Sequence, residues 1–275
     1  MDSQINAGSW KVEYFVKKMP TLSKPLLIEG LPGIANVGKI AVDFLVSDLK
    51  AKKLCSFFSY KFPHSVFVNE QKLIESPKIE LYYKKFKDPK KRDLLLLVGD
   101  VQPIDEVSCH TFCEQILGVV MDFGCTEIIT TGGIGLSSLP EEPLVYATAN
   151  DADFLKQFKV KKLGVATEIF GVVGPIIGVS GVLLGVASRH SVKAAALLAE
   201  TFSHQMYLGV KGAAAIVKVL DLKYKIGVKV EKINREIIDL EKEMMAKTQE
   251  WLKEMQTGGS EAGAKLKDPG HSYIG

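Results

Sequence analysis

The chain has 275 residues, 47% of them hydrophobic and 24% charged, and 35 Lys and Arg against 32 Asp and Glu give a formal net charge of +3. These proportions exclude collagen-like, mucin-like and wholly disordered proteins. So balanced a charge argues against a nucleic-acid binder, and four cysteines are too few for a disulfide scaffold. Because residues 1–20 contain no apolar signal core, we expect a cytoplasmic protein.

One long segment without charged residues raises the question of a membrane span. Residues 169–187 are close to the length that crosses a bilayer, but they contain five glycines and Pro175 besides apolar side chains. So many glycines in a single span make a poor helix. We therefore expect a buried loop and helix or strand of a globular core and no membrane partner.

Apolar periodicity predicts alternating strands and helices between residues 25 and 220. A strand at 26–28 leads through a glycine-rich turn at 30–33 into a helix at 37–50, and an unbroken apolar run at 94–98 is typical of a strand buried on both faces. Strands are also expected within 53–68 and at 79–86, 127–131, 162–167 and 194–200, and helices at 108–123, near 181–189 and at 208–220. This alternation predicts one α/β domain over residues 1–225, with a largely parallel sheet flanked by helices.

The C-terminal fifth of the chain has a different pattern. Apolar residues spaced alternately by four and three predict a long amphipathic helix over 226–256, with the stripe Ile226, Val230, Ile233, Ile237, Leu240 and Met244. Such a stripe either packs on its own domain or joins subunits into a homo-oligomer. Residues 257–275 are rich in glycine and polar residues, so we expect a flexible tail that can reach a partner.

Three glycine-rich or acidic segments follow predicted strands and could line one crevice. The carboxyl ends of parallel strands are where open sheets bind ligands. The candidate residues are Gly33, Asn36, Gly38 and Lys39 in a G-x4-G-K sequence, Asp100, and Gly132, Gly133 and Gly135. Ile40 stands where a phosphate-binding loop has the hydroxyl that holds Mg²⁺, so we favour a tight strand-to-helix turn over a nucleotide site.

The remaining chemical candidates give weaker signals. Cys109 and Cys113 share one face of a predicted helix and His110 points elsewhere, which favours two buried thiols over a metal site. His64, His190, His204 and His271 lie in separate segments without a nucleophile motif, and the basic residues at 84–92 favour a solvated loop over an RNA site. We expect no metal, no cofactor and no catalytic residue.

The ordered set of motifs resembles the archaeal proteasome assembly chaperone family, whose members are relatives of the second eukaryotic proteasome assembly chaperone. The resemblance rests on LIEGLPGIANVG at 27–38, GDVQP at 99–103, TGGIG at 131–135, the glycine-rich segment 174–185 and LLAET at 197–201. It covers about residues 25–220.

This resemblance implies a fold similar to nucleoside phosphorylases without established catalysis, a homo-oligomer, and C-terminal tails that dock between α-subunits of the 20S proteasome. The implied docking motif is hydrophobic–Tyr–any residue at the end of the chain. In that motif the Tyr is second from the end, whereas here Tyr273 is third from the end and Ser272 stands where the apolar residue is expected. The residues expected to contact the α-subunits are Tyr273, Ile274 and Gly275.

We therefore hypothesise that the protein is a non-enzymatic assembly chaperone that binds proteasome α-subunits. It would assemble either as a homo-oligomer or with a related paralogue. The alternative is an enzyme that binds a nucleotide or nucleoside in the glycine-rich crevice, similar to ATP-grasp enzymes or phosphorylases.

Overall fold

The computed structural model describes residues 10–69, 71–169, 171, 174–204 and 207–229. Two compact units divide the chain at residue 235. The described residues all belong to the first unit, Met1–Arg235, and the second lies wholly outside them.

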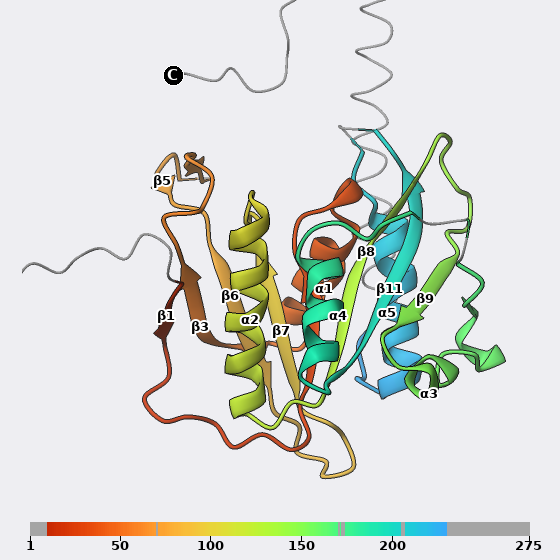
Figure 1. Ribbon diagram of the computed structural model, residues 1–275, viewed down its shortest axis with the longest axis horizontal. Helices are drawn as coiled ribbons and strands as arrows, with labels where there is room; N and C mark the ends of the chain where they lie inside the picture. The colour runs from red at the N-terminus through yellow and green to blue at the C-terminus, as the bar shows by residue number, and fades with distance from the viewer. Residues whose placement is uncertain (1–9, 70, 170, 172–173, 205–206, 230–275) are drawn as a thin grey trace, which may run out of the picture. The chain divides into compact units, whose positions relative to one another are not determined.

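The described residues form one large twisted sheet, drawn in Figure 1. Its strand order is β1-β3-β6-β7-β2-β8-β11-β9-β10. The central strands β7, β2, β8 and β11 are parallel, whereas β1, β3 and β6 on one side and β9 on the other pair antiparallel with their inner neighbours. The strands are β1 (Lys11–Tyr14), β2 (Leu26–Gly30), β3 (Lys52–Phe58), β6 (Ile79–Lys84), β7 (Leu94–Gly99), β8 (Glu127–Leu136), β9 (Val145–Ala149), β10 (Val165–Ala166) and β11 (Lys193–Phe202), and β4 (Phe67–Val68) and β5 (Ile74–Glu75) form a separate hairpin.

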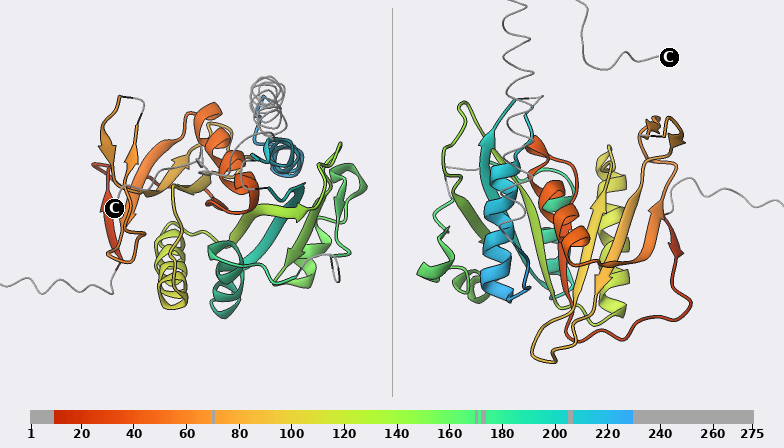
Figure 2. Two further views of the ribbon diagram at one scale, coloured as in Figure 1. Left: turned by 90° about the horizontal axis from the view of Figure 1, so that it is seen from above. Right: turned by 180° about the vertical axis from the view of Figure 1, so that it is seen from behind.

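Helices cover both faces of the central strands. Figure 2 shows α2 and α4 on one face and α1 and α5 on the other, and each pair is in contact. Helices α1, α2 and α5 follow the central strands β2, β7 and β11, and α4 leads into β11, as expected for an α/β fold. The helices are α1 (Val37–Asp48), α2 (Glu106–Asp122), α3 (Ala152–Lys156), α4 (Val179–Arg189) and α5 (Val210–Tyr224).

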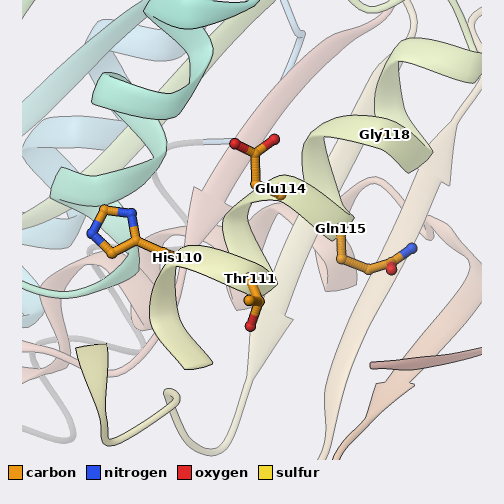
Figure 3. Close-up of a pocket in the computed structure, with 5 residues that line it drawn as sticks. All are labelled: His110, Thr111, Glu114, Gln115 and Gly118. Carbon is orange, nitrogen blue, oxygen red and sulfur yellow. The ribbon is translucent and has the colours of Figure 1, made fainter. Parts of the chain in front are cut away.

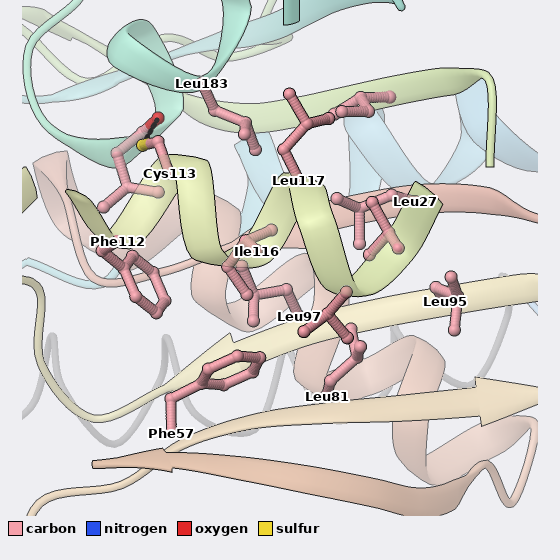
Figure 4. Packing of buried hydrophobic residues seen from close by; sticks show 14 of the residues in the cluster. Leu27, Phe57, Leu81, Leu95, Leu97, Phe112, Cys113, Ile116, Leu117 and Leu183 are labelled. Atoms are coloured by element: carbon pink, nitrogen blue, oxygen red, sulfur yellow. Dashed lines mark hydrogen bonds between the residues drawn. The ribbon is translucent and has the colours of Figure 1, made fainter. Parts of the chain in front are cut away.

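The core between α2 and the sheet explains the apolar runs of the sequence. Phe112, Ile116 and Leu117 of α2 belong to one buried cluster with Leu95 and Leu97 of β7 (Figure 4). Every residue of β7 is buried because helices cover both of its faces. The central strands and helices are thus held in place by apolar burial.

The expected strands and helices of the domain are confirmed, with one change of boundary that affects the predicted site. Gly132, Gly133 and Gly135 do not form a loop, because β8 continues through them to Leu136. Their backbones pair in register with Leu198–Thr201 of β11. The glycine pattern suggested a turn, but pairing with a long buried neighbour kept the segment extended.

Four strands and helices were not expected from the sequence. Strand β1 lies in a segment that carried no prediction, β5 lies between two expected strand regions, and β9 and α3 lie between residues 145 and 156, where no prediction was made. Each is short, and β1 pairs with β3, which is far away in sequence. Local periodicity over four or five residues is too weak to reveal such elements.

The uncharged segment at 169–187 leads into α4, which begins at Val179 and packs on α2. Over the part of the chain that the structure describes, no helix is long and apolar enough to cross a bilayer.

Of the predicted C-terminal stripe, the structure describes Ile226 alone. Residues 226–229 belong to no helix or strand, so the expected helix does not begin at Ile226, and Ile226 is 2% exposed, packed within its own unit. Val230, Ile233, Ile237, Leu240 and Met244 lie outside the described residues, as does the tail from 257 to 275.

Candidate functional site

The turn between β2 and α1 is the most constrained backbone at the carboxyl edge of the sheet. Ala35 and Asn36 both adopt left-handed conformations, with φ of 48° and 53°, in the short 3-10 turn Ile34–Asn36 that precedes α1. Such conformations are costly for residues other than glycine and persist only when their surroundings fix them. Here Gly209 donates its N–H to the carbonyl of Ala35 at 2.7 Å, which ties the turn to the start of α5.

Glycines let this turn pack directly on the neighbouring strand. A Cβ on Gly38, in the first turn of α1, would overlap the carbonyl of Thr131 in β8, and a Cβ on Gly133 would lie 2.7 Å from the carbonyl of Ile34. The predicted crevice residues are thus brought together, but backbone packs against backbone between them. Close helix-to-strand contact accounts for these glycines without a ligand.

Lys39, the last residue of the G-x4-G-K sequence, forms ion pairs with carboxylates. Its Nζ lies 2.9 Å from Asp43 Oδ2 and 3.7 Å from Asp100 Oδ1. Burial raises the pKa of Asp43, and the neighbouring ammonium of Lys39 opposes that shift. In a phosphate-binding loop the lysine reaches the phosphates, whereas this lysine neutralises acidic side chains of its own chain.

Glu29, at the end of β2, is a fully buried carboxyl group that sequence reasoning missed. Ser180 Oγ of α4 lies 3.0 and 3.2 Å from its two oxygens, and the N–H of Leu31 donates to Oε1 at 3.0 Å. Burial raises the pKa of Glu29 to about 7, although these hydrogen bonds favour the charged form. A glutamate at a buried strand position among leucines and isoleucine was the signal available in the sequence.

Gln102 joins the turn before α1 to the start of α4. Its amide nitrogen donates to the carbonyl of Pro32, and its Oε1 accepts the N–H of Val179 at 2.9 Å. Gly178 leaves room for this amide, because a Cβ there would lie 2.6 Å from Gln102 Oε1. The expected site segments at 30–38 and 99–103 therefore form one connected network with α4, a partner that the sequence analysis did not include.

Helix α2 carries two buried thiols and one exposed histidine, His110. Cys109 and Cys113 are buried, as expected, and a hydrogen bond with Cys109 together with burial raises the pKa of the Cys113 thiol. His110 lines a shallow depression of about 470 Å³ on the outer face, where Figure 3 shows it with Glu114. Glu114 Oε2 in turn lies 2.9 Å from His190 Nε2.

The other candidate residues are not brought together in the described structure. His64 and His204 are exposed on separate segments, and His271 lies outside the described residues together with Tyr273, Ile274 and Gly275. Among the described residues, no three His, Cys, Asp or Glu side chains are placed to hold a metal ion. The connected feature of this edge is therefore the network around Glu29 and Gln102, which joins three segments of the chain.

The region of the chain that contains this network matches a known protein family. Residues 27–248 match the PAC2 family, which covers most of the chain. The chain belongs to the PAC2 family. The resemblance seen in the sequence is thereby confirmed, and Gly38, Gln102 and Gly133 fall inside the matched region.

PAC2-family structures share this fold. The structure superposes on Pyrococcus furiosus PbaB, described as an archaeal proteasome activator, with a TM-score of 0.79 and 29% identity over 88% of this chain and 99% of that one. Pyrococcus furiosus PbaA, described as an archaeal homolog of proteasome-assembly chaperone, gives 0.69 at 23% identity over 90% and 95%. An uncharacterized protein of Methanocaldococcus jannaschii is 32% identical over 159 residues, 58% of this chain and 60% of that relative's length.

Proposed function

We propose that this chain is a non-enzymatic proteasome assembly chaperone or activator that binds the α-ring of the 20S proteasome. The observation that carries the proposal is the likeness to PbaB, which extends over almost the whole of that chain at 29% identity. Membership of the PAC2 family supports it. A proteasome partner also accords with a protein of the cytoplasm.

The geometry of the carboxyl edge supports this function over the alternative of a nucleotide- or nucleoside-binding enzyme. The glycines at 38 and 133 are accounted for by close packing, and Lys39 is engaged by Asp43 and Asp100. The glycine-rich turn, which would bind phosphate in such an enzyme, packs α1 directly against strand β8 in this structure.

The C-terminal segments are the proposed means of binding and assembly. Tyr273, Ile274 and Gly275 would supply an aromatic and apolar contact with α-subunits, and the residues from 257 onward would give it reach. A homo-oligomer would present several tails at once and so raise the effective concentration of each at the ring. A related paralogue is the other candidate for the neighbouring subunit.

Removal of the tail tests the proposed contact. A variant that ends at Gln256 should lose co-sedimentation with α-rings and keep the same number of subunits as the full chain. As a matched pair, Tyr273→Ala should weaken binding and Ser272→Ala should not, because the aromatic ring supplies the contact. Undiminished binding by the shortened variant would contradict the role of the tail.

The apolar stripe is proposed to hold the subunits together. Ile233→Asp with Ile237→Asp should reduce the mass measured by light scattering, since buried charges at a helix seam are strongly unfavourable. Lys232→Asp, next to the stripe, is the control and should leave the mass unchanged. If the double variant kept its mass, the stripe would belong to a single subunit.

A further inference from the structure

Strand β1 is an open edge of the large sheet. Over the described residues it pairs with β3 on one side and with no strand on the other, and it forms the outer margin of the sheet in Figure 1. It contains no proline, and the register irregularity of this region lies in β3 and not in β1. Proline and bulges are two of the devices by which natural edge strands avoid pairing with another chain, and β1 has neither.

The backbone groups available at this edge can be assigned from one hydrogen bond. Phe15 donates its N–H to the carbonyl of Leu54 in β3 at 2.9 Å. Because successive residues of an antiparallel strand point their N–H and C=O groups to alternate sides, Lys11 and Glu13 also face β3. The backbone groups of Trp10, Val12 and Tyr14 therefore point away from the sheet, toward an incoming strand.

The sequence around Val12 is self-complementary in an antiparallel pairing. We propose that a second copy of this chain adds its β1 to this edge across a twofold axis at Val12, which joins the two sheets into one. Val12 then pairs with Val12 of the second copy, and Trp10 pairs with Tyr14 at both ends. All three pairs use the outward-pointing groups, so each exchanges two backbone hydrogen bonds.

Charge selects this register over its neighbours. With the axis at Val12, Lys11 lies opposite Glu13 of the second copy on each side of the axis. Moving the axis by one residue would place Lys11 opposite Lys11, or Glu13 opposite Glu13, and like charges directly across a ladder are destabilising. Both side chains are exposed, so they are accessible to a second copy.

The side chains of Lys11 and Glu13 lie on the face of β1 that does not pack on the core. Trp10 is 8% exposed and packs against Phe112 of α2, with the two rings tilted and their centroids 4.5 Å apart. The side chains of Trp10, Val12 and Tyr14 therefore belong to the face that α2 covers. Lys11 lies on the other face beside Tyr60, 5.6 Å from its ring centre. Tyr14 is 40% exposed and would be covered by the second copy.

The pairing is small compared with ordinary dimer interfaces. A ribbon of five residues from each copy buries less than the roughly 1,200 Å² that stable complexes need, so we expect a concentration-dependent dimer. In a chain already held in an oligomer by other contacts, it would serve as a second type of interface. The inference does not depend on binding to a proteasome.

A mixed cross-linking experiment with the full chain tests both the surface and the register. Lys11→Cys and Glu13→Cys are made separately; the four native cysteines are buried and stay out of reach. Lys11 and Glu13 of the second copy form a non-hydrogen-bonded pair, whose Cα atoms lie about 4.5 Å apart, within the range of a disulfide. Oxidation should therefore give a cross-linked dimer in the equimolar mixture and none with either variant alone.

Two results would overturn the inference: no cross-link in the mixture at any concentration, or a cross-link with either variant alone, which would place the axis at Lys11 or at Glu13. Charge reversal provides an independent measurement. Lys11→Glu alone and Glu13→Lys alone should each weaken dimerisation by about tenfold or more, and the double variant should restore it. If the double variant were weaker than both single variants, the two residues would not face each other. Binding to α-rings, measured on the same proteins, reports the proposed function separately.

Discussion

At the scale of single residues, we expect Glu29 to make the stability of this fold depend on pH. Its carboxyl is 0% exposed, and its neighbours are the Ser180 hydroxyl, the N–H of Leu31 and the thiols of Cys109 and Cys113 on α2. No cation compensates a negative charge there among the groups that its hydrogen bonds reach in the described structure. Burial is therefore the dominant influence, and the protonated form is favoured in the folded state.

The sign of the pH dependence follows from the raised pKa. Between the ordinary value of 4.5 and about 7 the folded chain holds a proton that the unfolded chain has lost, so the free energy of unfolding falls as pH rises through this window. The loss attributable to Glu29 should reach about 3 kcal/mol above pH 7. Glu29→Gln keeps an acceptor for Leu31 and removes the titration, so the variant should be the more stable protein at pH 8.

Urea unfolding at pH 5 and pH 8 measures this difference, with Glu75→Gln on the exposed β4–β5 hairpin as a control for altered net charge. Parallel pH profiles for the native chain and Glu29→Gln would show that Glu29 does not titrate as described.

At the scale of elements, the contact between α1 and β8 depends on the absence of one methyl group. Gly38→Ala would force a Cβ into the carbonyl of Thr131, and neither the helix backbone nor the central strand can move away cheaply. We expect a loss of about 1–3 kcal/mol in the free energy of unfolding. Gly33→Ala is the matched control in the same turn, because nothing lies within 4 Å of its Cβ, and it should change stability by less than about 0.5 kcal/mol.

Thermal and urea unfolding of the two alanine variants decide between packing and ligand binding as the reason for these glycines. Equal stabilities would mean that Gly38 is not required by the packing.

The same elements show what can be predicted from the amino-acid sequence. Long apolar periodicity located α1, α2 and β7 because each buries many residues in a regular pattern. Gly132 and Gly133 were misassigned to a loop, since glycine favours turns locally, whereas pairing with β11 holds them in a strand. Propensity was overridden there by contacts that are distant in sequence.

The sequence was enough to predict which segments form the candidate site, but not which hydrogen bonds join them. Residues 30–38 and 99–103 were expected to meet because both follow parallel strands, and Gln102 does hydrogen-bond to Pro32. The part played by α4 could not be inferred, since Ser180 and Val179 are far along the chain from Glu29 and Gln102. Which buried polar groups pair is set by packing and not by spacing.

At the scale of the whole molecule, the fold combines a well-packed centre with surfaces suited to contact with other chains. The centre has parallel strands covered on both faces, and β1 forms an edge that carries Lys11 and Glu13. The proposed roles of this molecule therefore lie at its edge and in its C-terminal segments, and the glycine-rich turn holds the elements together.

The most direct test of this account is a titration of the purified full chain against purified 20S α-rings, followed by native mass spectrometry. We predict a complex that contains both proteins and that loses the chain when residues 257–275 are removed. An α-ring that stays unliganded at every concentration, with the chain folded, would contradict the central claim.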